Sequence, residues 1–458
     1  MENKPNIYSL AEKGIKYAFR TNSNLKAIEL YFSLNKDMDV EIEENSIKNN
    51  EFGYDTGFGI RVVDNRGALG FSFANNIEEK KFLNTIKNAM KMMSSGTPDP
   101  DFKDIPPSFT KYPKIKLLYD ENIKNLSIED SANYIQDLIK MCDSDDIAIS
   151  QSGGFSTSIS KTYIFNSNGL EAYSKESMCS ISSHMIVKDK ITNDTSFGFE
   201  YQISRTLKDI DAIKVAQMAL NKAKLNLNRR KIKKMKVPLI LSPQGTNSLI
   251  LKPLASAINA ETYQYNRSFL VGLRGKTIGS EHLNIEDNAL YDGAVGSSSF
   301  DGEGVPCQNK RIITRGTFHE KGLLHNFYTA SKEGVKSTGN AARSSYSSVP
   351  KIGISNFILK KGSLSKADLF NDTKYGILLN YTGDRPNLTT GDFSGLILQG
   401  NIIENGEIKE PLNETMLAIN LLDLFKKIEA VSKESKTYGS FRAPYVKINE
   451  VQIVGSVS

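Results

Sequence analysis

The chain has 458 residues, which is enough for two or three domains of ordinary size. Hydrophobic residues make up 39% of the sequence and charged residues 24%, a balance that excludes a disordered chain and favours a substantial core. The net charge of +6 identifies no acidic partner, and the lack of any run of about 18 apolar residues excludes a membrane-spanning helix.

The first quarter of the chain alternates between strand and helix patterns. Strands are predicted, in chain order, at residues 25–34, 40–47, 59–64 and 68–73. The last two are joined by a predicted hairpin turn at residues 65–67. A helix is predicted over residues 79–93, with Asn76 as its N-cap and Glu79 at capping-box spacing. Its apolar face is formed by Phe82, Ile86, Ala89, Met90 and Met93.

The next segment repeats this theme. Ser127 and Asp130 are predicted to open a helix whose apolar face is formed by Ile128, Ile135, Leu138, Ile139 and Cys142. Two strands joined by an Asn-Gly turn, and then a further helix, are predicted at residues 155–166, 170–187 and 211–225. Antiparallel hairpins beside helices predict an α+β fold rather than a regular alternation of parallel strands and helices.

A change in composition after the basic stretch at residues 226–236 marks the predicted start of a second half. A short apolar strand is predicted at 237–241, followed by a helix with Ser242 as N-cap and Pro243 at its first position. The remainder is rich in glycine, serine and short strands, with one late helix whose apolar face is formed by Leu421, Leu424, Phe425, Ile428 and Val431. We therefore divide the chain into two α+β segments of an N-terminal half and a β-rich C-terminal domain, at residues 1–110, 111–231 and 232–458.

The pair His319 and His325, with Glu320 between them, superficially resembles a zinc-binding motif. Its spacing does not fit, because six residues along a helix leave the two rings roughly 120° apart and about 9 Å displaced in rise. Neighbouring Arg-Gly and Lys-Gly dipeptides predict a hairpin turn, so an ordinary turn is favoured over a metal site. A meeting of the two histidines through tertiary folding stays open.

The other candidate motifs have simple structural explanations. The basic cluster at residues 229–236 lacks interleaved aromatic residues, which favours a solvated linker over a nucleic-acid site. Cys142, Cys179 and Cys307 are too few and too widely spaced for a disulfide framework or a cysteine-based zinc site. With no signal-peptide pattern at residues 1–8, these thiols favour a cytoplasmic location. No phosphate loop, nucleophile elbow or local catalytic signature is found.

Several motifs in a fixed order resemble the TldD/PmbA family, whose members are often described as modulators of DNA gyrase. In the first half they are residues 57–70 (GFGIRVVDNRGALG), 79–93 and 166–169 (NSNG). In the second half they are residues 300–306 (FDGEGVP), 336–340 (KSTGN), 390–395 (TGDFSG) and 404–406 (ENG). Each motif is weak alone, and their order over about 350 residues makes the resemblance specific.

The resemblance implies an N-terminal α+β domain, a C-terminal domain of curved, barrel-like antiparallel sheet, and a dimer enclosing a cavity in which unfolded peptides are cut. In the zinc-bearing branch, a HExxxH helix early in the C-terminal domain and a late cysteine hold the metal. The matching helix here, at residues 248–261, has no histidine, and Pro253 within it is expected to cause a kink. The late position at residues 438–440 has no cysteine. The chain therefore resembles the TldE/PmbA branch, and no catalytic residue or metal ligand is carried over.

We expect a non-catalytic subunit of a TldD/TldE-type zinc metallopeptidase complex, with no cofactor of its own and inactive alone. Its TldD-like partner subunit is expected to hold the zinc. Together they are expected to form a cavity that takes up unfolded peptides for proteolysis, with extended peptide bound by strand addition to a sheet edge. Candidates for lining this cavity, although a structural role in a turn is favoured for each, are Asp301, Glu303, Arg343 and Asp392.

Three alternatives stay open. The first is a stand-alone homodimer that binds peptides or another protein. The second, a DNA gyrase-associated regulator, is favoured less because the basic cluster has a linker explanation. The third is an independent metallopeptidase that uses His319, Glu320 and His325.

Overall fold

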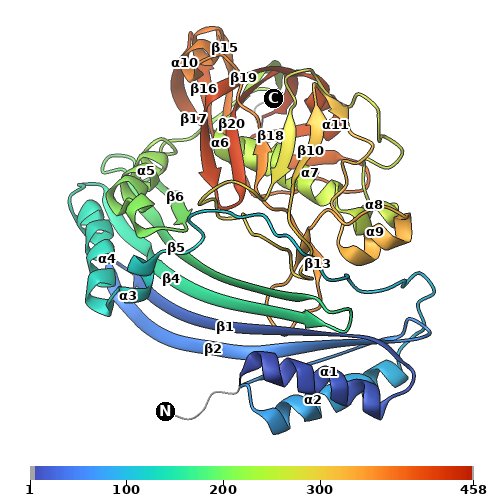
Figure 1. Ribbon diagram of the computed structural model, residues 1–458. Coiled ribbons are helices and arrows are strands. Elements are labelled where there is room, and N and C mark those ends of the chain that lie inside the picture. The colour runs from blue at the N-terminus through green and yellow to red at the C-terminus, as the bar shows by residue number, and fades with distance from the viewer. Residues whose placement is uncertain (1–5, 456–458) are drawn as a thin grey trace.

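In the computed structural model, which describes residues 6–455, the N-terminal half is a six-stranded sheet with helices packed on one face (Figure 1). Its strands lie in the order β3-β2-β1-β4-β5-β6, and all neighbouring pairs are antiparallel. The elements are α1 (Ile7–Thr21), β1 (Leu25–Glu43), β2 (Ser46–Asp64), β3 (Leu69–Asn75), α2 (Glu79–Ser94), α3 (Glu121–Asn125), α4 (Ile128–Asp143), β4 (Ala148–Asn166), β5 (Glu171–Lys188), β6 (Thr195–Ser204) and α5 (Ala212–Lys224).

Alternation along β1 separates the two faces of this sheet. Even-numbered residues such as Leu30 and Phe32 are buried in a core with α1 and α2, and Val40 and Ile42 are buried in a second core with α4 and α5. Odd-numbered residues from Glu29 onward point to the opposite, concave face, because successive side chains in a strand alternate. The C-terminal half lies over part of this concave face (Figure 1).

The two halves of the sheet repeat one arrangement of elements. Helix, long hairpin, shorter edge strand and second helix occur first as α1-β1-β2-β3-α2 and again as α4-β4-β5-β6-α5. Each edge strand carries a glycine against the helix that follows. A Cβ on Gly70 would lie 2.0 Å from the carbonyl oxygen of Ala89, and a Cβ on Gly198 would lie 2.0 Å from that of Ala219. Each copy of this set of elements is longer than the 20–50 residues of short structural repeats.

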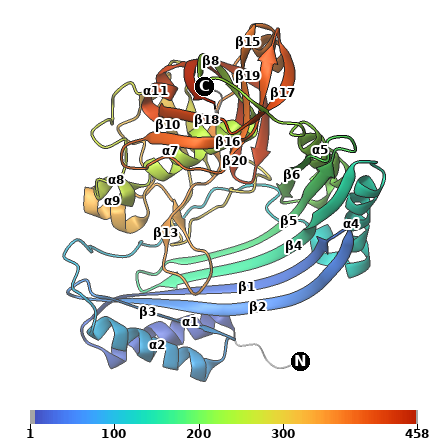
Figure 2. The same cartoon turned by 180° about the vertical axis from the view of Figure 1, so that it is seen from behind.

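The C-terminal half is built around a second sheet of 12 strands with short helices at its sides (Figure 2). Its elements are β7 (Arg230–Lys231), β8 (Met235–Leu241), α6 (Pro243–Thr246), α7 (Lys252–Ala257), α8 (Ala260–Gln264), β9 (Ile285–Asn288), β10 (Asn309–Thr314), β11 (Thr317–Phe318), α9 (Phe327–Glu333), β12 (Ala341–Ala342), β13 (Lys351–Ile352), β14 (Phe357–Leu359), α10 (Lys366–Asn371), β15 (Tyr375–Thr382), β16 (Asp392–Glu404), β17 (Glu407–Asn413), β18 (Met416–Asn420), α11 (Leu421–Lys426), β19 (Ile428–Tyr438) and β20 (Phe441–Val454). Strands β12 and β13 form a separate hairpin.

Five strands of the larger sheet close into a barrel. Strand β20 pairs with β8, β8 with β15, β15 with β16, β16 with β18, and β18 returns to β20. The closed ring leaves no free edge among these strands and surrounds an apolar core that includes Leu239, Ile377 and Leu417. The predicted α+β class with a barrel-like sheet is confirmed, although the β8–β15 and β14–β20 pairs are parallel.

Three predicted elements differ from the structure. Residues 25–34 and 40–47 are predicted as separate strands, but β1 is continuous to Glu43 because its charged residues alternate with buried apolar ones. The predicted strand at 40–47 is also wrong at its end, because Glu44 and Asn45 form the turn to β2, which begins at Ser46. Asn76 has a left-handed backbone and does not cap α2, whose N-cap is Glu78. The late helix ends at Lys426, so Ile428 and Val431 belong to β19.

Other sequence predictions are confirmed. Ser127 and Asp130 form the capping box of α4, and the hairpins between β2 and β3 and between β4 and β5 occur where their turn residues predict them. Ser242 caps α6, with Pro243 at its first position. Within the described part of the chain, every helix is too short or too polar to cross a membrane.

Candidate functional site

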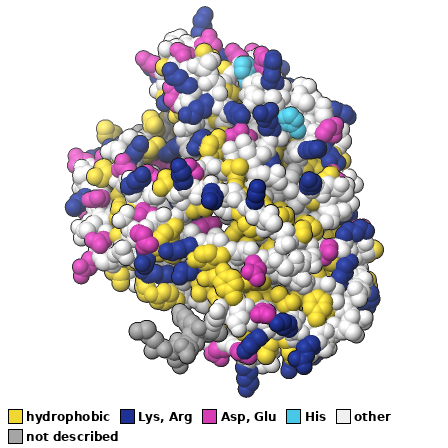
Figure 3. Space-filling view, viewed as in Figure 1, with side chains coloured by type: hydrophobic (Ala, Val, Ile, Leu, Met, Phe, Trp, Pro, Cys, Tyr) yellow, Lys and Arg dark blue, Asp and Glu magenta, His cyan; other side chains and the backbone are white. Residues whose placement is uncertain are grey.

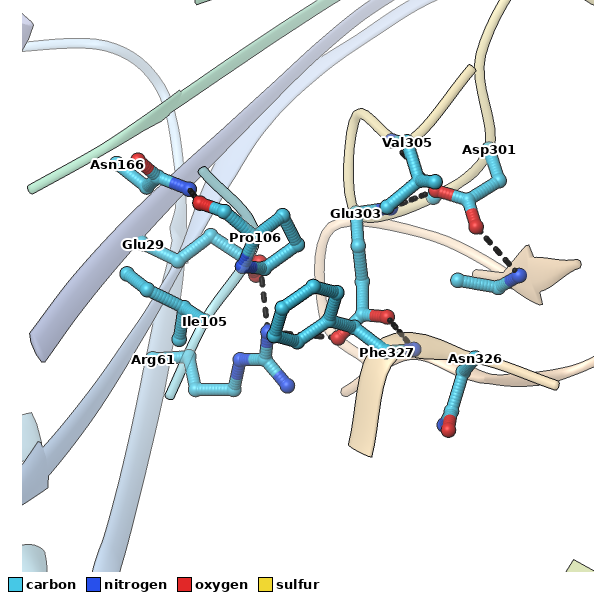
Figure 4. Close-up of polar contacts among 12 residues, drawn as sticks. Glu29, Arg61, Ile105, Pro106, Asn166, Asp301, Glu303, Val305, Asn326 and Phe327 are labelled. Atoms are coloured by element: carbon cyan, nitrogen blue, oxygen red, sulfur yellow. Dashed lines mark hydrogen bonds and ion pairs between the residues drawn. The ribbon is translucent and has the colours of Figure 1, made fainter. Parts of the chain in front are cut away.

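A buried ion network joins the concave face of the N-terminal sheet to the C-terminal half (Figure 4). Nη2 of Arg61 donates to Oε2 of Glu29 at 2.7 Å and to Oε1 of Glu303 at 2.9 Å. Nη2 of Arg343 donates to the other carboxylate oxygen of Glu29, and the backbone N–H of Phe327 donates to Oε2 of Glu303 at 2.8 Å. Both glutamate side chains are 1% exposed, so protein groups rather than water compensate their charge.

Sheet register and a tight turn position these groups. Glu29 and Arg61 are directly opposite on β1 and β2, which places both side chains on the concave face. Glu303 lies in a turn that the carboxylate of Asp301 stabilises. Oδ1 of Asp301 accepts the N–H of Glu303 at 2.9 Å, and Oδ2 accepts the N–H of Ala341 at 2.9 Å.

The electrostatics of the network follow from its burial. Burial and the charge of Glu303 raise the pKa of Asp301 to about 7. Burial alone lowers the pKa of Arg61, but the carboxylates of Glu29 and Glu303 outweigh this effect and raise the pKa above its ordinary value. Nε of Arg61 is buried without a hydrogen-bond partner. Asp301 therefore changes protonation near neutral pH.

A second junction between the halves is built on Arg205, which follows β6. Its Nη2 donates to the carbonyl oxygens of Val295 at 2.7 Å and Ser297 at 3.0 Å, in a loop of the C-terminal half. Its Nη1 donates to Oε2 of Glu176 on β5 at 2.8 Å. One guanidinium thus ties a loop of the C-terminal half to the sheet.

A third junction lies at the β6 edge. Glu200, which is 1% exposed, accepts hydrogen bonds or ion pairs from Lys222 on α5, at 3.2 Å, and from Lys436 on β19. Burial lowers the pKa of Lys222, and the charge of Glu200 acts in the opposite direction. The aromatic rings of Tyr201 and Tyr438 lie 5.6 Å apart beside this pair.

Beyond the part covered by the C-terminal half, the concave face is an open polar trough. It includes a cavity of about 160 Å³ lined by Asp37, Asp39, Ser156, Thr157, Ser158, Met178, Cys179 and Ser180. Burial raises the pKa of Asp39, and the charges of Asp37, Glu41 and Glu51 add to this effect. The trough therefore has a negative potential and many small hydroxyl groups.

Three of the four residues proposed from the sequence come together. Asp301 and Glu303 belong to the buried turn, and Arg343 reaches the same network through Glu29. Asp392 lies elsewhere, exposed on β16, where it accepts a hydrogen bond from Nδ2 of Asn420 at 2.9 Å that lowers its pKa. Their predicted role in lining a peptide cavity stays a prediction.

The two histidines of the tentative zinc pattern have separate partners. Nε2 of His319 lies 2.8 Å from Oγ1 of Thr314, within the predicted hairpin formed by β10 and β11. His325 is buried, with Nδ1 3.3 Å from Oγ1 of Thr329 and Nε2 3.9 Å from Glu333. Burial lowers the pKa of His325. In the described part of the chain, no three His, Cys, Asp or Glu side chains are arranged to hold a metal ion.

The segment expected to match the metal-binding helix of the zinc branch packs into the C-terminal core. Residues 248–261 run through a π-helical stretch at Asn247–Leu251, α7 and the start of α8, and Pro253 lies in the first turn of α7. Leu249, Leu251 and Leu254 are fully buried in this segment. Its side chains are mainly aliphatic and include no imidazole or thiolate, so the residues present do not fit a zinc ion.

Sequence reasoning missed several residues of these sites. Glu29 and Arg61 were not singled out, although Arg61 lies within the glycine-bearing motif at residues 57–70. Asp37 and Asp39 were also missed. The sequence feature that could have identified Asp37 and Asp39 is the alternation of polar and apolar residues along β1, which places the carboxylates on one face.

Comparison with known proteins places the chain among metallopeptidase relatives. Three domain models match: PmbA/TldA metallopeptidase domain 1 at residues 28–93, the central domain at 121–227 and the C-terminal domain at 234–455. A metalloprotease PmbA homolog of Buchnera aphidicola is 26% identical over 455 residues, covering 96% of each chain. A metalloprotease TldD homolog of the same organism is 24% identical, covering 89% of this chain and 85% of the homolog.

Solved structures share the whole fold. The crystal structure of TldE from Thermococcus kodakarensis has a TM-score of 0.88 at 22% identity, covering 98% of this chain and all of that one. The crystal structure of a Thermotoga maritima protein described as a modulator of a DNA gyrase has a TM-score of 0.87 at 20% identity, covering 98% of this chain and all of that one. Because the three domain models together span most of the sequence, the chain belongs to the PmbA/TldD metallopeptidase family.

Proposed function

We propose that the chain is a non-catalytic subunit of a TldD/TldE-type zinc metallopeptidase complex. The observation that carries this proposal is the aliphatic character of residues 248–261, which include no imidazole where the zinc branch is expected to have two. A zinc peptidase needs ligands to hold the metal and an acid/base group to activate water. The zinc and the catalytic groups are then supplied by a TldD-like partner subunit.

The chain's own contribution to such a complex is to shape a cavity for unfolded peptides. The open trough on the concave face, with its carboxylates and hydroxyls, supports this role because extended peptides carry many hydrogen-bonding groups. The proposal places the complex in the cytoplasm and requires no nucleic acid. Arg230 and Lys231 of the basic cluster form β7 rather than a free linker, and pair with Glu410 at 2.6 Å and Glu414 at 2.7 Å.

Metal analysis and peptide hydrolysis test the proposal together. The purified chain is expected to retain far less than one zinc per chain and to leave an unfolded, fluorogenic peptide uncut. Adding a TldD-type subunit from the same organism is expected to produce hydrolysis that exceeds the rate of that subunit alone. One tightly held zinc per chain, or metal-dependent hydrolysis by this chain alone, would remove the proposal.

A second candidate is a stand-alone homodimer that binds peptides. The trough supports this function as well, because its carboxylates and hydroxyls can bind an extended peptide without a second subunit. Native mass measurement separates the two functions. A stable homodimer that does not exchange subunits with a TldD-type chain supports the stand-alone function, whereas a mixed dimer supports the complex.

A further inference from the structure

The N-terminal part of β2 is an unpaired sheet edge. Strand β3 covers β2 only from Gly57 to Val63, so among the described residues the stretch 46–56 has β1 on one side and no strand on the other. Almost every residue of this stretch is exposed, and burial begins where β3 does. The carbonyl oxygen of Thr56 accepts the N–H of Asn76 at 2.8 Å, and before it alternate N–H and C=O groups along the edge can pair with another chain.

This edge belongs to a strongly acidic part of the chain. Residues 35–56 contain seven carboxylates and two lysines, a net charge of −5 in a chain whose total is +6. Both lysines already have partners. Lys48 forms an ion pair with Glu43, and Nζ of Lys36 donates to the carbonyl oxygen of Lys124 at 3.0 Å. The segment therefore favours a cationic partner and opposes a second copy of itself.

Gly53 has no side chain, so the space between the edge and the carboxylates on the concave face is open. It is directly opposite Asp37 in the sheet, and a Cβ at Gly53 would have no atom within 4 Å. Asp39 is opposite Glu51, which points to the same face. Because strands are about 4.8 Å apart, a lysine or arginine on an added strand has room to extend over Gly53 toward Asp37 and Asp39.

The other face of the same edge carries two exposed aromatic rings, with Nζ of Lys36 5.3 Å from the centroid of the Phe52 ring. Phe52 and Tyr54 point to the helix-bearing face, where they are 47% and 73% exposed, and Phe52 lines a small cavity with Ile123 and Leu126. Hydrophobic side chains are visible on the surface over the long strands in the view of Figure 3. A strand added here would present alternate side chains to an acidic face and to a face that carries the aromatic rings of Phe52 and Tyr54.

We propose that residues 46–56 of β2 bind an extended peptide as a seventh strand, with lysine or arginine toward Asp37 and Asp39 and apolar residues toward Phe52 and Tyr54. Main-chain pairing supplies affinity, and the alternation of basic and apolar side chains supplies selectivity. This inference rests on the proposed peptide-handling function and names the class of peptide that this chain selects.

Fluorescence anisotropy tests the inference on the full chain alone, without a zinc-bearing partner. The probe is a fluorescein-labelled nonapeptide of alternating lysine and valine. One comparison peptide has glutamate in place of lysine, and another keeps the lysines but is N-methylated at alternate backbone nitrogens. The lysine peptide is expected to bind, the glutamate peptide not to bind, and N-methylation to weaken binding by about tenfold because ladder hydrogen bonds are lost.

Variants locate the binding site. The double change Asp37→Asn with Asp39→Asn, and separately Gly53→Val, are each expected to weaken binding of the lysine peptide by about tenfold. The matched control Asp423→Asn with Glu450→Gln removes two carboxylates from the C-terminal half and is expected to leave affinity unchanged. Circular dichroism and thermal unfolding of each variant show that loss of binding is not loss of folding.

Four outcomes overturn the inference. If the N-methylated peptide binds as tightly as the unmodified lysine peptide, charge attraction rather than strand pairing explains binding. If the control variant weakens binding as much as the Asp37 and Asp39 variant, the peptide responds to the overall charge of the protein and not to this edge. A concentration-dependent homodimer that Gly53→Val dissociates indicates that a second copy occupies the edge. Hydrolysis on mixing with a TldD-type subunit is measured separately. If the chain supports hydrolysis but does not bind the lysine peptide, this inference is wrong and the proposed function still stands.

Discussion

Arg61 is the cation that two buried carboxylates share. It contacts both Glu29 and Glu303, and its side chain is 9% exposed while theirs are 1% exposed. Replacing a buried ion network by apolar residues can be neutral, but removing one partner leaves uncompensated charge. Arg61→Met is therefore expected to lower the free energy of unfolding by about 3–5 kcal/mol, measured by urea denaturation.

The matched control for this variant is Arg315→Met. Arg315 also forms an ion pair, with Glu281 at 2.8 Å, but its side chain is 76% exposed. Water and salt screen such a pair, so no measurable loss of stability is expected. A loss for Arg61→Met as small as for Arg315→Met would show that Glu29 and Glu303 are compensated by other groups.

Asp301 gives the protein a pH dependence of a defined sign. Its pKa is raised to about 7 in the folded state, above the value of about 3.9 for an unfolded aspartate. As pH rises, Asp301 therefore loses its proton at a lower pH in the unfolded chain than in the folded chain. The stability that the neutral carboxyl contributes is present below about pH 4 and is lost as pH rises to about 7. The stability advantage of the wild type over Asp301→Asn is expected to shrink across that window in urea titrations. An advantage that is constant or grows with pH would contradict this assignment.

At the scale of residues, the sequence identified only the members of the buried ion network that come from the C-terminal half. Asp301, Glu303 and Arg343 stood out because they lie in or near turn motifs of the C-terminal half. Glu29 and Arg61 did not, because their meeting with Glu303 depends on strand register and on contacts across more than 200 residues of sequence. Local patterns carry no information about such pairing.

Glycines set the distance between the edge strands and helices in both halves of the N-terminal sheet. At Gly70 and Gly198 a Cβ would lie 2.0 Å from a helix carbonyl oxygen, so the helix would have to move. Gly70→Ala and Gly198→Ala are each expected to destabilise the protein by about 1–3 kcal/mol, seen as a lower Tm. Gly53→Ala is the control, because its Cβ meets nothing within 4 Å. Equal Tm values for all three variants would show that the helices shift without cost.

Elements with strong local signals were predictable, and those whose form depends on tertiary pairing were not. The α4 capping box and the Asn-Gly turn between β4 and β5 specify their own geometry. In contrast, Ile428 and Val431 continue a helical spacing from Leu421, yet they lie in β19 because β20 pairs with them. The ends of β1 and β2 likewise depend on each other more than on composition.

At the scale of the whole molecule, the two halves are joined by polar contacts as well as by packing. Phe300 and Tyr112 form an apolar contact with the sheet, while Glu303, Arg205 and Glu200 anchor three separate polar junctions. The barrel and the curved sheet were expected only through family resemblance, because closure is set by pairings between strands distant in sequence. The division at residue 232 stays a prediction, with β7 just before it paired to β17.

The Arg205 junction offers a test of how the halves hold together. Its guanidinium donates to Val295 and Ser297, so Arg205→Met removes the donors that order this loop and leaves Glu176 without its arginine partner. Amide hydrogen exchange in residues 291–300 is expected to accelerate about tenfold or more, while exchange in the barrel strands stays unchanged.

Arg230→Met is the control for this variant, because Arg230 forms an ion pair with Glu410 at 2.6 Å but is largely exposed. It is expected to leave exchange in residues 291–300 at the wild-type rate, since an exposed pair orders no buried loop. If Arg205→Met instead accelerated exchange throughout the barrel, the two halves would unfold as one unit, and the loop would not be a separate point of opening.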